Sequence, residues 1–222
     1  MSVILLFLAV LATIAGWWLS KQRLTAKPWL EEGAIGDFPG GGASALPAAK
    51  IGLGVFLAVA GSLLALFVSA YAMRMHMAQD WRPLPEPKLL WLNTGVLVVS
   101  SIALHRALLA ARRGRMDGVM ANLLAGGGSA VVFLAGQILA WRQMAASGYV
   151  PASNPADAFF YLITAVHGLH LLGGLVALAR AIAKAWPGVA TDQLRLSVEL
   201  CAMYWHFLLL VWLGLFGMLL LT

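Results

Sequence analysis

Charged residues are scarce in this sequence. Only 11% of its 222 residues are Asp, Glu, Lys or Arg, whereas 61% are hydrophobic, and the mean hydropathy is +0.85. A soluble domain carries about 25% charged residues. So few polar side chains cannot cover the surface of a fold in water. The composition therefore excludes a soluble globular protein and indicates a polytopic membrane protein.

Cysteine and the common catalytic motifs are also missing or nearly so. The single cysteine, Cys201, lies inside an apolar segment, which excludes a disulfide framework and a thiolate metal cluster. There is no Walker or Rossmann glycine pattern, no nucleophile elbow, no HExxH and no pair of carboxylates at acid/base spacing. The 15 Lys and Arg occur in short clusters between apolar runs, so the net charge of +6 does not indicate nucleic-acid binding.

Long hydrophobic runs are what the sequence does contain. Closed β-barrels would show short alternating strands instead, so the runs predict membrane-spanning helices. They cover residues 3–20, 51–75, 88–110, 119–142, 157–179 and 195–221. The predicted fold class is therefore all-α, a polytopic membrane helix bundle of six transmembrane helices.

The distribution of Gly, Lys and Arg predicts the organisation of this bundle. Residues 1–49 are expected to hold an N-terminal transmembrane helix and a cytoplasmic Gly-rich linker, and residues 50–222 a five-helix block. The connections after the first, third and fifth spans, together with the adjoining span ends, contain eleven Lys and Arg, against four on the other side. Because positive charge favours cytoplasmic loops, both termini are predicted to lie outside.

Polar side chains within the spans are hypotheses for functional sites, because ionisable groups in hydrocarbon cost free energy. His167 and His170 are three residues apart, so they share one face of a helix. Their pattern favours interhelical hydrogen bonds over metal or haem ligation. The run from Met73 to Met77 contains soft ligands of the type that copper takes, although methionine is also ordinary packing material.

The last predicted span also carries ionisable groups. Glu199 is expected to pair with Arg195, four residues before it, with a proton relay as the alternative. His206 needs a hydrogen-bond partner at mid-membrane, and that partner is expected on the span 157–179.

Five segments together resemble subunit III of the haem-copper respiratory oxidases, the cytochrome c oxidases and their quinol-oxidase relatives. The segments are GLGVFLAVAGSLLALFVSAYAMR, LLWLNTGVLVVSSIAL followed by ALLAARRGR, LAGQILAWRQM, FFYLITAVHGLH and ELCAMYWHFLLLVWLGLF. The last two are the most specific. The resemblance covers the chain from about residue 50 to its end and implies the last five of seven helices, with the C-terminus outside.

This resemblance implies a non-catalytic subunit III of a terminal oxidase of the cytochrome c oxidase type. Such a subunit supports assembly, lipid binding and sustained turnover of the proton-pumping, oxygen-reducing subunit I in aerobic respiration. The resemblance further implies that this chain holds no metal or other cofactor. Haem and copper are expected in the partner subunits, and the expected partners are oxidase subunits I and II and bound phospholipid. The implied location is a bacterial-type inner (plasma) membrane.

The resemblance also assigns structural roles to polar residues. Trp91 and Asn93 are expected to orient the span 88–110, and Arg74 and Arg142 to contact lipid headgroups on the outer side. The residues expected to organise the interior of the block are His167, His170, Glu199, Tyr204, Trp205 and His206.

The sequence departs from the family at three points. Ala60 and Leu209 stand where the family has a glutamate and an aspartate, and a glutamate placed at position 60 is expected to lie alone in an apolar region. In addition, one predicted span, not two, precedes the five-helix block.

Three other functions remain open from the sequence. One is an accessory protein of nitric oxide reduction with the same subunit III fold. Another is a membrane b-type cytochrome in which His167 or His170 pairs with His206. A small transporter is the third, although the inverted repeat and broken helices typical of transporters are not found in the sequence.

Overall fold

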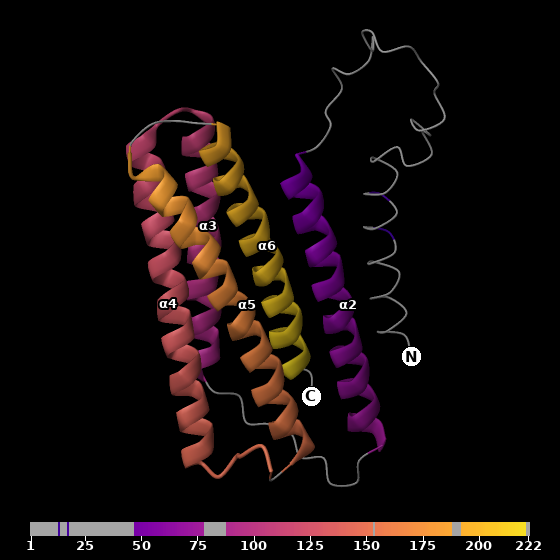
Figure 1. The fold of residues 1–222 in the computed structure, drawn as a ribbon. Helices are drawn as coiled ribbons and strands as arrows, with labels where there is room; N and C mark the ends of the chain where they lie inside the picture. Colours follow the sequence, from indigo (N-terminus) through magenta and orange to yellow (C-terminus); the bar gives the residue numbers. More distant parts are fainter. Residues whose placement is uncertain are drawn as a thin grey trace, which may run out of the picture. The chain divides into compact units, whose positions relative to one another are not determined.

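The computed structural model in Figure 1 describes residues 47–77, 88–152, 154–187 and 192–220, together with Thr13 and Trp17. Its helices in these ranges are α2 (Ala48–Met77), α3 (Lys88–Arg112), α4 (Met116–Ala146), α5 (Pro155–Ala185) and α6 (Asp192–Leu220). All five are long and apolar enough to cross a membrane. The all-α membrane fold and five of the six predicted spans are thus confirmed. Apart from Thr13 and Trp17, the predicted span 3–20 lies outside the described residues.

The helices extend beyond the predicted spans. α4 and α5 contain 31 residues each, which corresponds to about 46 Å at 1.5 Å per residue, whereas the hydrocarbon core of a bilayer is about 30 Å thick. Hydropathy detects only the part of a helix that lies in hydrocarbon. The ends of these helices therefore reach the headgroup region, where polar residues continue the helix.

Local sequence signals explain the helix ends. The Asn154 side chain accepts a hydrogen bond from the backbone N–H of Ala156, and Pro155 occupies the first turn of α5, where no N–H donor is needed. Gly148 ends α4 with a φ of 89°, and Gly114 has a φ of 68° in the three-residue turn between α3 and α4. Both conformations favour glycine. The short turn makes α3 and α4 antiparallel neighbours.

Four of the helices form a closed bundle. α3 packs against α4 and α6, and α5 also packs against α4 and α6 (Figure 1). The largest fully buried side chains at the centre are Trp205, Trp212, Phe133 and Phe160. A methyl group added at Gly126 of α4 would lie 2.5 Å from Leu104 Cδ2, so α3 and α4 approach closely there.

α2 contacts this bundle through aromatic and aliphatic side chains. The ring of Phe56 lies 6.3 Å from that of His170 and 6.1 Å from that of Tyr204, measured between ring centroids. Towards the other end of α2, Tyr71 packs edge-on against Phe159 at 5.4 Å. α2 therefore lies against α5 and α6.

Candidate functional site

Polar side chains join α3 to α6 along most of their length. Trp205 Nε1 donates a hydrogen bond to Ser100 Oγ at 2.9 Å, and Ser100 Oγ donates to the carbonyl oxygen of Gly126 on α4 at 2.7 Å. Two turns further along α6, Trp212 Nε1 donates to Thr94 Oγ1 at 2.9 Å. These bonds satisfy buried indole and hydroxyl groups across three helices. We call the whole set the α3/α6 seam, made of Thr94, Ser100, Ser101, His105, Arg112, Glu199, Trp205, His206 and Trp212.

His206 belongs to this seam, which corrects the prediction that its partners lie on the span 157–179. Its Nδ1 is 2.6 Å from Ser101 Oγ, and its Nε2 is 3.4 Å from His105 Nδ1. Both partners are on α3. The physical reason is the rotation of α6, which turns His206 towards α3 and the outside of the bundle, where His105 and His206 are both exposed.

Glu199 is paired across helices. Its Oε1 lies 3.9 Å from Nη2 of Arg112, at the end of the seam near the turn between α3 and α4. This ion pair joins α6 to α3, and the pairing of Glu199 with Arg195 on its own helix stays a prediction. Both side chains are partly exposed, at 49% for Arg112 and 24% for Glu199. Such a pair adds little to stability.

Tyr204 joins α6 to α5. Its hydroxyl donates to the backbone carbonyl of His170 at 2.9 Å, and its ring packs where Gly174 has no side chain. The His170 imidazole itself donates from Nδ1 to the carbonyl of Val166, at 2.8 Å within the same helix. The prediction of interhelical hydrogen bonds from the His170 ring is therefore wrong, because its own helix supplies the acceptor.

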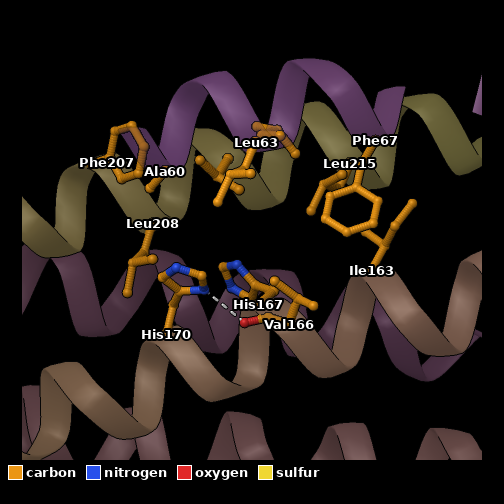
Figure 2. A pocket seen from close by; sticks show the side chains of 12 residues that line it. Ala60, Leu63, Phe67, Ile163, Val166, His167, His170, Phe207, Leu208 and Leu215 are labelled. Atoms are coloured by element: carbon orange, nitrogen blue, oxygen red, sulfur yellow. Dashed lines mark hydrogen bonds between the residues drawn. The ribbon is translucent and has the colours of Figure 1, made fainter. Parts of the chain in front are cut away.

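His167 has no hydrogen-bond partner on either ring nitrogen. It is 3% exposed and packs against Trp212 and Phe133, at ring-centroid distances of 5.1 and 5.8 Å. The interhelical hydrogen bond predicted for it is not formed. His167 and His170 do share one helix face, as their spacing predicts, and both line a cavity of about 70 Å³ between α2, α5 and α6 (Figure 2).

A second polar cluster joins the end of α4 to the beginning of α5. Trp141 Nε1 donates to Thr164 Oγ1 at 2.9 Å, and Thr164 Oγ1 donates to its own helix at the carbonyl of Phe160. The Tyr161 hydroxyl lies 3.0 Å from the carbonyl of Tyr149 in the connection between the two helices. These contacts hold α4, α5 and their connection together at this end of the bundle.

Trp91 and Asn93 occupy opposite sides of α3. Asn93 is buried against Gly136 of α4, with its side-chain amide nitrogen unpaired. Trp91 is 57% exposed and packs edge-on against Phe216 of α6 at 4.9 Å. Asn93 thus faces α4 and Trp91 faces α6.

A larger groove lies between α2, α5 and α6, with a volume of about 470 Å³. Arg180 and Lys184, one turn apart near the end of α5, line it, and Lys184 Nζ donates to Ser197 Oγ of α6 at 3.1 Å. The rest of its lining is mostly apolar and includes Phe56, Leu200 and the backbone at Gly173. A groove with cations at one end and apolar walls can accept an anionic amphiphile.

The two arginines predicted to contact lipid are exposed near the ends of α2 and α4. Arg74 and Arg142 both lie in the last turns of these helices. In the nearby methionine run, Met73 and Met77 are exposed as well, at 62% and 73%, and the His76 side chain lies outside the described residues.

The residues that the structure describes contain no group of three or more His, Cys, Asp or Glu side chains that could hold a metal ion. His206 bonds to α3, whereas His167 packs between aromatic rings and faces the cavity, so the two do not form a facing bis-imidazole pair. The polar residues are arranged to join helices.

Sequence reasoning missed several residues of these sites. His105 and Arg112 on α3, and Arg180 and Lys184 on α5, were not predicted as site residues. One signal was present, because His105 and Arg112 are seven residues apart, as are Glu199 and His206. Because α3 and α6 are antiparallel, these equal spacings let His105 pair with His206 and Arg112 pair with Glu199. The direction in which each helix faces could not be predicted from one sequence.

Comparison with known proteins identifies relatives over most of the chain. The model of a family described as cytochrome c oxidase subunit III matches residues 50–221. The protein named probable cytochrome c oxidase subunit 3 of Nocardia farcinica is 32% identical over 164 residues, which cover 68% of this chain and 76% of that protein.

Two further relatives come from other branches. Cytochrome c oxidase subunit 3 of Thermostichus vulcanus is 28% identical over 173 residues, covering 76% of this chain and 85% of that protein. Subunit 3 of the cytochrome bo(3) ubiquinol oxidase of Pseudomonas aeruginosa is 27% identical over 124 residues, covering 56% of this chain and 59% of that protein.

Proposed function

The chain belongs to the cytochrome c oxidase subunit III family and serves as a subunit III, and we propose that it does so as a non-catalytic part of a haem-copper terminal oxidase. In this role it stabilises the oxygen-reducing, proton-pumping subunit I, binds phospholipid and sustains turnover. Its partners are subunits I and II, which hold the haem and copper. The observation that carries the proposal is the α3/α6 seam, because it presents an imidazole pair to the outside of the bundle at membrane depth.

The exposed imidazole pair supports a docking face on α3 and α6. His105 lies seven residues, or about 10 Å, inside the end of α3. His206 occupies both of its ring nitrogens with Ser101 and His105, so only Nε2 of His105 remains to face outwards. Lipid tails offer no hydrogen bond, and ionisable residues in membranes normally face protein or water. A transmembrane helix of subunit I with a hydrogen-bonding side chain would pair with this nitrogen of His105.

Site-specific photo-crosslinking in native membranes tests this docking face. A benzoylphenylalanine at Ile102, one turn before His105 and 51% exposed, is expected to crosslink to subunit I. The same probe at Val131 of α4, which is 55% exposed, is the matched control and is expected to yield no such product. Crosslinks from position 131 and none from position 102 would move the interface to α4.

The groove at Arg180 and Lys184 supports phospholipid binding. Its two cations suit a phosphate group, and its apolar walls suit an acyl chain. Arg74 and Arg142 are proposed as further headgroup contacts on the opposite side of the membrane. Mass spectrometry of lipids retained by the purified complex tests this. The double variant R180Q/K184Q is expected to lose anionic phospholipid, whereas R74Q/R142Q is expected to lose less, because Arg74 and Arg142 are exposed near the ends of their helices.

Topology and cofactor content complete the proposal. We place the chain in a bacterial-type inner membrane with both termini outside, an N-terminal span at residues 3–20, a cytoplasmic linker up to residue 49 and the five-helix block from residue 50. Reporter fusions at the termini and at Gly114 test this. The purified chain without subunit I is expected to be colourless. A stoichiometric Soret band would favour a b-type cytochrome instead.

A further inference from the structure

The Ser101 hydroxyl group differs from the other two hydroxyl groups of the α3/α6 seam. Thr94 and Ser100 both donate to backbone carbonyl oxygens, at 2.8 and 2.7 Å. Ser101 Oγ lies instead 2.6 Å from Nδ1 of His206, and among the residues that the structure describes it has no second partner. Because Ser101 is only 2% exposed, its proton needs an acceptor within the bundle. That acceptor is Nδ1 of His206.

This bond determines where His206 carries its proton. A neutral imidazole has one N–H donor and one acceptor nitrogen, so a ring that accepts at Nδ1 carries its proton on Nε2. The opposite arrangement, in which Nδ1–H donates to Ser101, would leave the buried hydroxyl proton without an acceptor. The ring is neutral because a charge at membrane depth costs free energy. The ring of His105, at a centroid distance of 5.5 Å, would also repel it if both were charged.

The same reasoning extends to His105. His206 Nε2 lies 3.4 Å from Nδ1 of His105, so the N–H of His206 donates and Nδ1 of His105 accepts. The proton of His105 is therefore on Nε2. Three groups thus donate in one direction, from Ser101 to His206 to His105, and the last donor is the Nε2–H of His105, which faces outwards.

The surface around His105 offers nothing to this last donor. Ile102, one turn before it on α3, is 51% exposed, and on α6 Met203 and Leu210 are 39% and 65% exposed on either side of His206. These side chains are apolar, and a thioether accepts hydrogen bonds only weakly. Lipid tails have no acceptor either. An acceptor for the Nε2–H of His105 has to come from another molecule.

We propose that His105 presents a hydrogen-bond donor to subunit I, and that the residue of subunit I seated on α3 and α6 carries an acceptor oxygen, from the side chain of an Asp, Glu, Asn or Gln. This inference rests on the proposed docking of subunit I through this face. A Lys, Arg or Trp at that place in subunit I is excluded, because these side chains have donors only and would set N–H against N–H. Ser101, buried within this chain, thereby selects the chemistry of its partner.

Solid-state NMR of the full chain with ¹⁵N-labelled histidine, in phosphatidylglycerol-containing vesicles, tests the proton positions without subunit I. The chain has five histidines, and the variants His105→Phe and His206→Phe assign the two signals. We expect the Nε2–H form for both rings. A proton on Nδ1 of His206 in the unmodified chain overturns the proposal.

Removal of one hydroxyl group sharpens this measurement. Ser101→Ala takes away the donor to Nδ1, so we expect an Nδ1–H form of His206 to appear. Ser129→Ala is the matched control, because that hydroxyl group donates to the carbonyl of Ala125 on its own helix, and it should leave both rings unchanged. Unchanged rings in Ser101→Ala would show that Ser101 does not set the proton positions, and would overturn the proposal.

Co-purification of subunit I with variants of the full complex tests the outward donor. His105→Gln can still accept from His206 and donate outwards, whereas His105→Met has a similar length and no donor. We expect near-normal recovery of subunit I with His105→Gln and a several-fold loss with His105→Met. Equal recovery with His105→Met and the unmodified chain overturns the proposal.

The crosslinking experiment at Ile102 separates this inference from the docking face on which it rests. Crosslinks from position 102 together with an Nδ1–H form of His206 would overturn the donor assignment and leave the docking face in place. The Nε2–H forms without crosslinks from position 102 would overturn the docking face, and with it the proposed partner of His105.

Discussion

The α3/α6 seam and the cavity between α2, α5 and α6 use polar residues in opposite ways. In the seam, hydroxyl, indole and imidazole groups are paired across helices at 2.6 to 3.4 Å. In the cavity, His167 is buried without a partner, and the surrounding wall is apolar. Polar groups that meet across an interface fix the packing of helices by hydrogen bonds, whereas the His167 ring is held by packing against Phe133 and Trp212 alone. The seam should therefore be sensitive to mutation and the cavity tolerant.

The largest effect is expected at the centre of the seam. Trp205→Ala removes a side chain that is fully buried and should lower the free energy of unfolding by about 3–5 kcal/mol, as for other buried Trp or Phe. Trp205→Phe keeps most of the ring and loses the bond to Ser100, so it should cost only about 0.6–1.7 kcal/mol. Thermal unfolding of the purified complex measures both. Equal losses would mean that the hydrogen bond, not the packing, dominates.

A medium effect is expected from His206→Leu, which breaks the contacts to Ser101 and His105. Loss of these bonds costs on the order of 1–2 kcal/mol in a membrane bundle. We expect a lower yield of assembled complex with near-normal turnover per subunit I. Leu210→Ile, at an exposed position one turn away, is the control. Normal yield with collapsed turnover would instead assign His206 to a proton or redox pathway.

A smaller effect is expected from Thr94→Val, which has nearly the same shape. It removes the acceptor of the Trp212 indole and should cost about 0.6 kcal/mol, the average for such bonds in membrane helices. Ser62→Ala serves as the control, because the exposed Ser62 hydroxyl bonds only to Ala58 of its own helix. A shift in the unfolding temperature for Thr94→Val and none for Ser62→Ala is the expected result.

The smallest effect is expected in the cavity, from Ala60→Glu. A lone charged carboxyl in mid-membrane costs about 2.5–3.5 kcal/mol, but at position 60 the new side chain lines the same pocket as His170, and as a neutral carboxylic acid it can donate to Nε2 of that ring. We expect near-normal accumulation in membranes, measured by immunoblot. Ala58→Glu places the same group at an exposed position of α2 and should accumulate less. Equal accumulation of the two variants would show that the His170 ring gives no support.

The positions of the helices could be predicted from the sequence, but the side of each helix that contacts a given neighbour could not. Length and hydropathy predict five spans that the structure confirms, because the hydrocarbon core fixes how many apolar residues a helix needs. The spacing of His167 and His170 correctly puts them on one face. By contrast, the predicted partners of His206 were on the wrong helix, because the rotation of α6 depends on packing with all its neighbours. The position of Ala60 opposite His167 and His170 could not be predicted for the same reason.

The seam also sets an order of events during synthesis, because its two halves lie far apart in the chain. α3 ends at Arg112 and α6 begins at Asp192, so the ribosome must add about 80 residues between them, which takes about 4–16 s at roughly 5–20 residues per second. During that interval Thr94, Ser100 and Ser101 have not yet met their partners on α6. A nascent chain halted before Asp192 would lack the hydrogen bonds that Trp205 and Trp212 donate to Ser100 and Thr94, so its α3 and α4 would have formed without the tryptophans that join them to α6.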